Sequence, residues 1–346
     1  RNGLFDMIGS SLLKRTKNTM QLSLVLVFLC FFFSMFITND VSLITFVPFA
    51  MLTLRKCNQD KLLIPVIIVQ TLAANLGSML TPIGNPQNLY LYNLAEMKMS
   101  TFIGIIGPYT LTSGILLLLS VAVVCRKKEK IEFTLEENNG DHEIEKERLH
   151  LRRKTHQKNA VYLILFLMSL LVVVRVLPYY VAFIVVFVTV FIMDRQVLKT
   201  VDYSLILTFI AFFIFTGNIG EIETIRNVLQ EFVSGREVGV GIAASQVISN
   251  VPAALLLSGF TRDYAKLLVG VNIGGLGTLI ASMASLISFK YIAREYPAQK
   301  GRYFCMFTLA NVFFLLVMLI VYLVFLSPVF VKNKTICLSI LICVGR

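Results

Sequence analysis

The sequence predicts an all-α polytopic membrane protein whose helices are broken at defined points. Hydrophobic residues make up 56% of the 346 residues, charged residues make up 15%, and the mean hydropathy is +0.77. Apolar runs that suit a bilayer recur along the whole chain. Some of these runs are interrupted by Gly, Pro and Asn, which lipid tolerates only where the backbone is buried in protein or faces a wet cavity.

The expected spans follow from the apolar runs, because about 17 to 25 apolar residues cross the hydrocarbon core. They cover residues 19–37, 41–55, 62–80, 102–125, 159–175, 177–193, 203–217, 239–260, 264–289 and 303–327. Several of these runs are too short to cross alone, so we expect some of them to pair or to be interrupted.

Two stretches are expected to be re-entrant hairpins. Residues 221–248 hold an amphipathic segment and a turn at Ser234 and Gly235. The N-terminal stretch up to about residue 36 has the same character, with its turn near residues 14–17. If the two halves are equivalent, roughly 60 residues that match 159–220 are missing from the first half. We therefore expect the first repeat to be truncated at its N-terminus.

The most informative segment is Asn75–Asn88, which carries breakers and amides inside an apolar run. A second copy starts at Asn272 and aligns without a gap, with Asn, Gly, Thr, Ile and Leu recurring in register. Each copy follows a shorter polar break, at residues 38–40 and 249–250. Interrupted apolar segments at matching positions of two halves point to the substrate site of a secondary transporter.

The basic residues give a topology. The chain carries 32 Lys and Arg against 20 Asp and Glu, a formal charge of +12. In a membrane protein such residues collect in cytoplasmic loops, so we expect no nucleic-acid partner. The charged segment 126–158 is expected to be a cytoplasmic loop. With this loop inside, Arg55, Lys56, Lys61, Arg294, Lys300 and Arg302 also lie inside, and Lys98, Arg262 and Lys266 lie outside.

This topology makes the two repeats inverted, because the first break is approached from the cytoplasm and the second from outside. The expected division is a truncated first repeat over 1–125, the loop over 126–158, an inverted second repeat over 159–327 and an atypical tail over 328–346. Neither the six scattered cysteines nor the three histidines of the loop predict a metal site or a cofactor. No nucleophile–base cluster in the membrane runs predicts an enzyme.

Three motifs in this order resemble the ion transporter superfamily: residues 36–49, residues 81–88 and residues 249–254. Within it the chain is most similar to citrate-transporter-like and arsenite-permease-like proteins. In the related divalent-anion/sodium symporters, two Ser-Asn-Thr signatures at hairpin tips hold substrate carboxylates and sodium ions. Thr38-Asn39-Asp40 and Ser249-Asn250-Val251 match these positions, with an acid and a valine in place of the two threonines.

The site follows from the resemblance and from the chemistry of the breaks. Half-helix N-termini suit an anion, and unwound carbonyls suit a dehydrated cation. The residues expected to bind substrate are Thr38, Asn39, Thr81, Pro82, Gly84, Asn85, Asn88, Ser249, Asn250, Thr278 and Ser282. Those expected to hold the coupling ion are Asp40, Asn39, Asn75, Gly77, Asn250, Asn272 and Gly274.

Asp40 is the most notable single residue, because an ionisable group at membrane depth is costly and by default points to function. It is a candidate carrier of a coupling proton or sodium ion. The alternative role is structural, as the N-cap of the half-helix that follows.

The sequence therefore predicts a secondary transporter that moves a small inorganic or organic anion across the cell membrane by alternating access, coupled to sodium or protons. It is expected to contact lipid and to form a homodimer. Sodium/proton antiport, an uncoupled anion channel and a truncated product without function stay open as alternatives.

Overall fold

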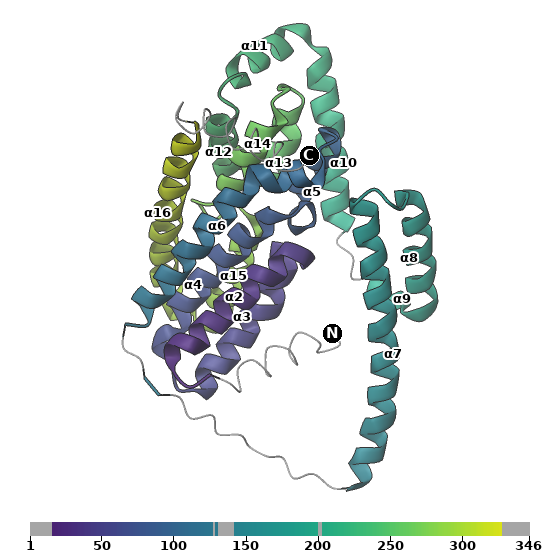
Figure 1. Cartoon of the computed structure of the whole chain (residues 1–346), viewed down its shortest axis with the longest axis vertical. Helices are drawn as coiled ribbons and strands as arrows, with labels where there is room; N and C mark the ends of the chain where they lie inside the picture. Colours follow the sequence, from purple (N-terminus) through teal and green to yellow (C-terminus); the bar gives the residue numbers. More distant parts are fainter. Residues whose placement is uncertain (1–15, 127–128, 131–141, 200–202, 327–346) are drawn as a thin grey trace, which may run out of the picture.

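The computed structural model describes residues 16–126, 129–130, 142–199 and 203–326. Within these ranges the chain forms helices and no β-strand, with one isolated bridge between Asn18 and Lys130 (Figure 1). The all-α class is confirmed. The helices of the first part are α2 (Thr19–Ile37), α3 (Asn39–Lys56), α4 (Asp60–Gly77), η1 (Ser78–Leu80), η2 (Pro82–Gly84), α5 (Pro86–Leu94) and α6 (Met99–Val124).

The second part begins after the charged segment. Its helices are α7 (His142–Val173), α8 (Tyr179–Met193), α9 (Arg195–Lys199), α10 (Tyr203–Glu221), α11 (Glu223–Val233), α12 (Glu237–Ile248), α13 (Asn250–Ser258), α14 (Tyr264–Ile273), α15 (Met283–Glu295), η3 (Pro297–Gln299) and α16 (Lys300–Leu326). The helices break where the sequence predicts, at Thr38, at Ser249 and in the two Asn-Gly stretches.

Helix α4 lies at the centre of the bundle. It packs against α2, α3 and α6 of the first part and against α15 and α16 of the second. The span Asp60–Leu80 is 89% buried, whereas the span that includes α16 is 22% buried. The end of α4, where its helix unwinds after Gly77, is therefore held inside protein on every side.

Four helices among the described residues are long and apolar enough to cross a membrane: Thr19–Ile37, Asp60–Leu80, Met99–Val124 and Pro297–Val324. Shorter apolar helices include α8, α12 and α14. Large apolar side chains of α8 are exposed, with Phe183 68% and Ile192 74% accessible. Such surfaces are typical of lipid-facing helices, because lipid tails replace the protein contacts that a soluble core needs.

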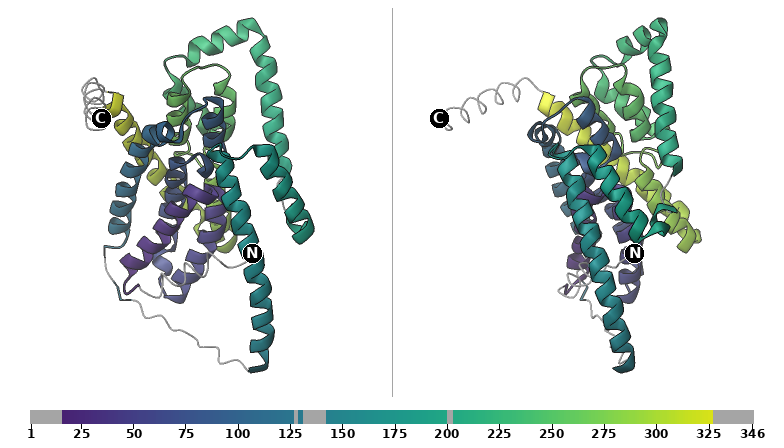
Figure 2. Two further views of the ribbon diagram at one scale, coloured as in Figure 1. Left: turned by 45° about the vertical axis from the view of Figure 1, so that its right-hand side comes forward. Right: turned by 90° about the vertical axis from the view of Figure 1, so that its right-hand side faces the viewer.

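The prediction that residues 126–158 form a loop is wrong from His142 onward, where helix α7 begins. The run from His142 to Val173 contains neither Gly nor Pro and is rich in Glu, Lys, Arg and Leu, which favour helix. The N-terminal part of α7 extends beyond the ends of α2, α3 and α4 (Figures 1 and 2). The high charge density of residues 142–158 therefore does not prevent a helix, and this helix continues without a break into the apolar second part of α7.

The predicted hairpin over 221–248 has a turn where expected, because Gly235 has φ +79° between α11 and α12. The two helices do not pack along each other, however. Helix α11 contacts α10, and α12 packs against α13 and α14. Helix α11 lies at the opposite end of the molecule from the start of α7 (Figures 1 and 2). The first predicted hairpin begins in residues 1–15, which lie outside the described ranges. The tail predicted over 328–346 also lies outside them.

Candidate functional site

The two polar breaks have the same backbone. Thr38, between α2 and α3, has φ 75° and ψ 151°, and Ser249, between α12 and α13, has φ 72° and ψ 154°. Residues other than glycine rarely adopt this region, and holding one there costs about 1–3 kcal/mol. Because the same strained conformation occurs at both matching positions, the surrounding structure must impose it twice. Such strain tends to persist at ligand sites.

The same glycine contact supports each break. A Cβ on Gly77 would lie 2.7 Å from Ser34 Oγ, and one on Gly274 would lie 2.6 Å from Ser245 Oγ. Ser34 stands four residues before Thr38, and Ser245 stands four residues before Ser249. The two helix pairs α2–α4 and α12–α14 therefore approach each other at equivalent points, where only glycine fits.

A threonine hydroxyl ties each unwound stretch to its break. Thr81 Oγ1 donates to the carbonyl of Met35, and Thr278 Oγ1 donates to the carbonyl of Gln246 at 3.3 Å. Each acceptor lies three residues before its break residue. Thr81 and Thr278 are also paired in the ungapped alignment. The duplication seen in sequence is thus matched by side-chain geometry.

Buried amides join the first break to the second half of the chain. Asn75 Oδ1 accepts hydrogen bonds from Asn39 Nδ2 at 3.1 Å and from Ser282 Oγ at 2.9 Å. Asn75 Nδ2 donates to Ser285 Oγ at 3.3 Å. All four side chains are buried. One amide of α4 therefore contacts the start of α3 and the start of α15.

The contact between the halves is reciprocal. Asn75 Nδ2 donates to Ser285, and Asn272 Nδ2 donates to Asn88 Oδ1 at 2.7 Å. In the alignment, Asn75 corresponds to Asn272 and Asn88 corresponds to Ser285. When residue i contacts j′ and the equivalent i′ contacts j, the two units are related as across a two-fold axis. The two unwound stretches are thus interlocked, because the asparagine that begins each one contacts the end of the other.

The two halves differ at one acceptor. Asn75 Oδ1 has two donors, whereas Asn272 Oδ1 is buried with no partner among the described residues. Asp40 Oδ1 and Asn85 Oδ1 share this condition. A buried polar oxygen without a donor costs about 1–3 kcal/mol and calls for a ligand or a water. Side-chain oxygens of Gln70, Gln87, Glu237 and Asn311 are also buried without a partner among the described residues.

Family comparison gives the identity. A family model described as "Citrate transporter" matches residues 1–266. The chain belongs to the citrate transporter family. It is 34% identical over 288 residues to the uncharacterized transporter MJ0456 of Methanocaldococcus jannaschii, covering 82% of this chain and 74% of that protein. It is 30% identical over 296 residues to the inner membrane protein YbiR of Escherichia coli K12, covering 84% and 74%.

As a transporter of this family, the chain has the multi-pass helical character that its apolar helices indicate. The resemblance to citrate-transporter-like proteins is confirmed. Thr38, rather than Asp40, is the cap of α3, since its hydroxyl faces Val41 N at 3.5 Å. Asp40 lies in the first turn of that helix, and its backbone N–H donates to Asn39 Oδ1 at 2.9 Å. The structural alternative for Asp40 as an N-cap is therefore wrong.

The first unwound stretch of this family member folds around one serine. Asn85 Nδ2 donates to Ser78 Oγ at 2.8 Å, and Asn88 Nδ2 lies 3.3–3.4 Å from the carbonyls of Ser78, Met79 and Thr81. A Cβ on Gly84 would lie 2.0 Å from the Ser78 carbonyl oxygen, so only glycine fits there. Pro82 opens η2 directly before this point.

At the second break the expected residues are only partly brought together. The Asn250 backbone N–H donates to the Ala281 carbonyl at 3.0 Å, and Ser249 Oγ donates to the same carbonyl at 3.4 Å. Ser282, next in the chain, reaches across to Asn75. Thr278 is exposed and contacts Gln246 rather than the amide cluster.

Gln246 is the main residue that sequence reasoning missed. Its Nε2 donates to the carbonyls of Gly274 and Leu276, both at 2.9 Å, and its Oε1 accepts from Thr278 N at 2.9 Å. This one side chain supplies hydrogen bonds to backbone groups that have no intrahelical partner, because the stretch is unwound there. The available signal was a lone glutamine within an apolar run. Met35 holds the equivalent position in the first half, so the alignment gave no second copy.

The first break also borders a cavity of about 590 Å³. Thr38 lines it together with Ile83 from the first unwound stretch and with apolar side chains of α7 and α8, among them Phe166 and Phe183. This cavity opens one face of the break toward the α7–α8 pair.

Proposed function

We propose that this protein is a secondary active transporter that moves a small anion, a carboxylate or an oxyanion, across the cytoplasmic membrane, coupled to sodium or protons by alternating access. The observation that carries the proposal is the pair of interlocked unwound stretches, with nearly equal backbone angles at the breaks Thr38 and Ser249 and the reciprocal contacts of Asn75 and Asn272. Paired broken helices with reciprocal contacts are how transporters build a midplane site.

An inverted repeat is the arrangement we propose for the halves over 1–125 and 159–327. A two-fold relation allows either a parallel or an inverted duplication. The positive-inside topology favours inversion. In this topology the segment that leads to the first break enters the membrane from the cytoplasm, and the segment that leads to the second break enters from outside. On this basis residues 221–248 form a re-entrant segment whose helices α11 and α12 are joined at Gly235 without packing along each other, and segment 126–158 is cytoplasmic.

The anion is proposed to bind between the N-termini of α3 and α13. These ends present the positive end of the helix dipole, and an anion there would compete with the acceptors that the N–H groups of Asp40, Val41 and Asn250 have now. The proposed substrate contacts are made by the side chains nearest those ends and by the unwound stretches beside them. They are Thr38, Asn39, Thr81, Pro82, Gly84, Asn85, Asn88, Ser249, Asn250, Thr278 and Ser282.

The coupling ion is proposed to bind oxygen ligands next to the anion. The carbonyls released where α4 and α14 unwind suit a dehydrated cation. Asn39, Asn75, Gly77, Asn250, Asn272 and Gly274 surround these points. The unpartnered oxygens of Asp40 and Asn272 support this assignment.

Substituting Asn250 by alanine tests the anion site. The Asn250 side chain is buried at the start of α13, so its loss removes polar contacts to a charged ligand worth about 1.5–3 kcal/mol. We expect the KM for the transported anion to rise about tenfold or more, measured as initial uptake into proteoliposomes.

A matched control for Asn250→Ala is Asn311→Ala. Asn311 is also buried, but it lies in α16 and donates to the Phe307 carbonyl in its own helix. We expect its KM to stay at the wild-type value. An unchanged KM in Asn250→Ala would remove the second break from the binding site.

Sodium/proton antiport is the second candidate, and Asp40 favours it. An acid at the start of a half-helix with an unpartnered oxygen can exchange a proton for a sodium ion. The two functions differ in whether sodium moves without the anion. With no anion present, an antiporter still moves sodium when a pH gradient is imposed, whereas the proposed symporter needs the anion.

A further inference from the structure

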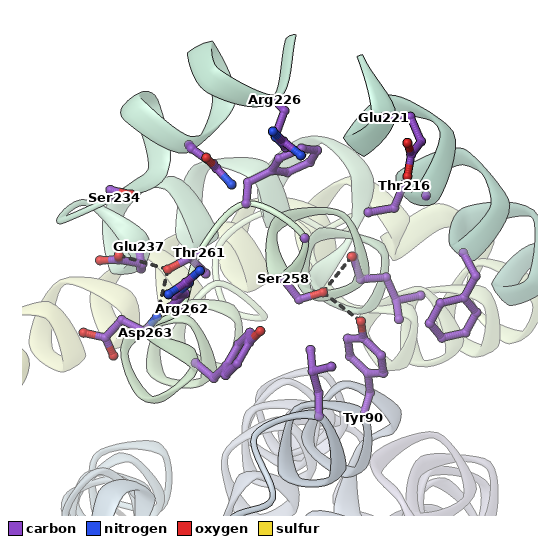
Figure 3. A pocket seen from close by; sticks show the side chains of 18 residues that line it. Tyr90, Thr216, Glu221, Arg226, Ser234, Glu237, Ser258, Thr261, Arg262 and Asp263 are labelled. Carbon is purple, nitrogen blue, oxygen red and sulfur yellow. Dashed lines mark hydrogen bonds between the residues drawn. The ribbon is translucent and has the colours of Figure 1, made fainter. Parts of the chain in front are cut away.

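A large polar cavity lies away from the paired breaks. Its volume is about 980 Å³, and it is lined by α5, α10, α11, α13 and the loop that leads to α14 (Figure 3). None of the substrate or coupling-ion residues assigned above lines it. This size is typical of small-molecule sites.

Two arginines enter this cavity from different elements. Arg226 comes from α11 and Arg262 comes from the loop between α13 and α14 (Figure 3). Within the described part of the chain, neither guanidinium group has an ion pair or a hydrogen bond. Guanidinium groups are the side chains best matched to carboxylate and oxyanion geometry.

Three carboxylates also line the cavity, and within the described residues none of them forms an ion pair with either arginine. Glu237 Oε1 accepts hydrogen bonds from Thr261 Oγ1 at 3.1 Å and from Gly235 N at 3.0 Å, and its Oε2 is buried without a partner there. Asp263 is paired with Lys266 Nζ at 2.8 Å. Glu221 is exposed. Glu221 and Glu237 therefore stand beside the two arginines as charges without an ion-pair partner, and both guanidinium groups keep their donors available to a ligand.

The loop that carries Arg262 is held in place on both sides. On one side Thr261 donates to Glu237, and on the other the Asp263 N–H donates to Thr261 Oγ1 at 3.0 Å. The backbone at Arg262 is thus held by hydrogen bonds, while its side chain is exposed to a ligand that enters the cavity.

We propose that Arg226 and Arg262 form a capture site for a small mono- or dianion bearing a carboxylate or phosphate-like group, separate from the paired breaks. The predicted topology places Arg262 on the outside, where basic residues are scarce, so its presence in the cavity favours a role in binding over one in membrane orientation.

The floor of the cavity connects this site to the breaks. Tyr90 and Ser258 share a hydrogen bond of 2.8 Å between their hydroxyls (Figure 3). Tyr90 belongs to α5, which starts beside Asn85, and Ser258 ends the nine-residue α13, which starts at Asn250. At 1.5 Å per residue, α13 spans roughly 12 Å. An anion held by the arginines is therefore one half-helix from the proposed site.

Fluorescence offers a direct test, because the chain contains no tryptophan. Tyr264 lines the cavity, so Tyr264→Trp places a single indole there. Titration of the purified protein with succinate, and separately with inorganic phosphate, at constant ionic strength is expected to change the indole emission saturably. Adding Arg226→Gln and Arg262→Gln together is expected to raise the apparent Kd at least tenfold.

Arg236→Gln is the matched control. Arg236 is exposed in the turn between α11 and α12 and does not line the cavity. Its loss changes the net charge by one, as each of the two arginine substitutions does on its own, and we expect the Kd to stay unchanged. No saturable response to either anion, a response that survives the double substitution, or an equal loss in Arg236→Gln would overturn the proposal. This binding assay does not depend on uptake, so a failure of the transport proposal would be seen separately.

Discussion

Asp40→Asn is expected to abolish gradient-driven uptake, reducing it to the level of protein-free liposomes. The substitution keeps the size of the side chain but removes its charge. Asp40 lies in the first turn of α3 beside Asn39, and its Oδ1 is buried without a partner among the described residues. A carboxylate so placed favours a cation or proton next to the anion site, so its loss uncouples the gradient from the substrate.

Asp60→Asn is the control for this prediction. Asp60 lies in the first turn of α4, the equivalent position in another helix, but it is exposed. We expect Asp60→Asn to transport normally. Size-exclusion profiles and thermal midpoints of both variants should equal those of the wild type. Gradient-driven uptake that is unchanged in Asp40→Asn would remove this carboxylate from the mechanism.

Gly77→Ala is expected to produce a large loss of stability. A Cβ at this position would lie 2.2 Å from the Phe31 carbonyl oxygen and 2.7 Å from Ser34 Oγ. The first of these atoms is backbone, so α2 and α4 must separate to accept the methyl group. Overpacking of this kind costs about 1–3 kcal/mol and occasionally more. We expect a clear fall in the thermal midpoint of the purified protein, together with loss of uptake.

The comparison for Gly77→Ala is Gly104→Ala in α6, where an added Cβ would meet nothing within 4 Å. Alanine favours helix over glycine by about 1 kcal/mol, so Gly104→Ala should leave the midpoint unchanged or raise it. Equal midpoints for the two variants would show that the close approach of α2 and α4 does not constrain position 77.

Much of the fold follows from the sequence, because uniform apolar runs and polar interruptions act locally. The span predicted over 19–37 coincides with α2, and the breaks at Thr38 and Ser249 lie where hydroxyl and amide residues interrupt apolar runs. The start of α7 at His142 was missed because charge density was weighed above helix propensity.

The site could be predicted only in part. Breaker residues and amides revealed which stretches unwind, so Asn75, Asn88 and Asn272 were identified. Their partners depend on how the halves pack, which no local pattern encodes. The contact of Asn75 with Ser285 and the role of Gln246 therefore required the structure. The presence of two arginines at one cavity also required the structure, since they come from separate elements.

The most direct test of the central claim is uptake by the wild-type protein in proteoliposomes. Citrate, succinate and arsenite uptake would be measured with and without imposed sodium and pH gradients. Coupled anion transport predicts accumulation of at least one of these substrates that is stimulated by a gradient and abolished when the gradient is collapsed. Sodium/proton exchange that is indifferent to all three, or anion flux that ignores every gradient, would contradict it.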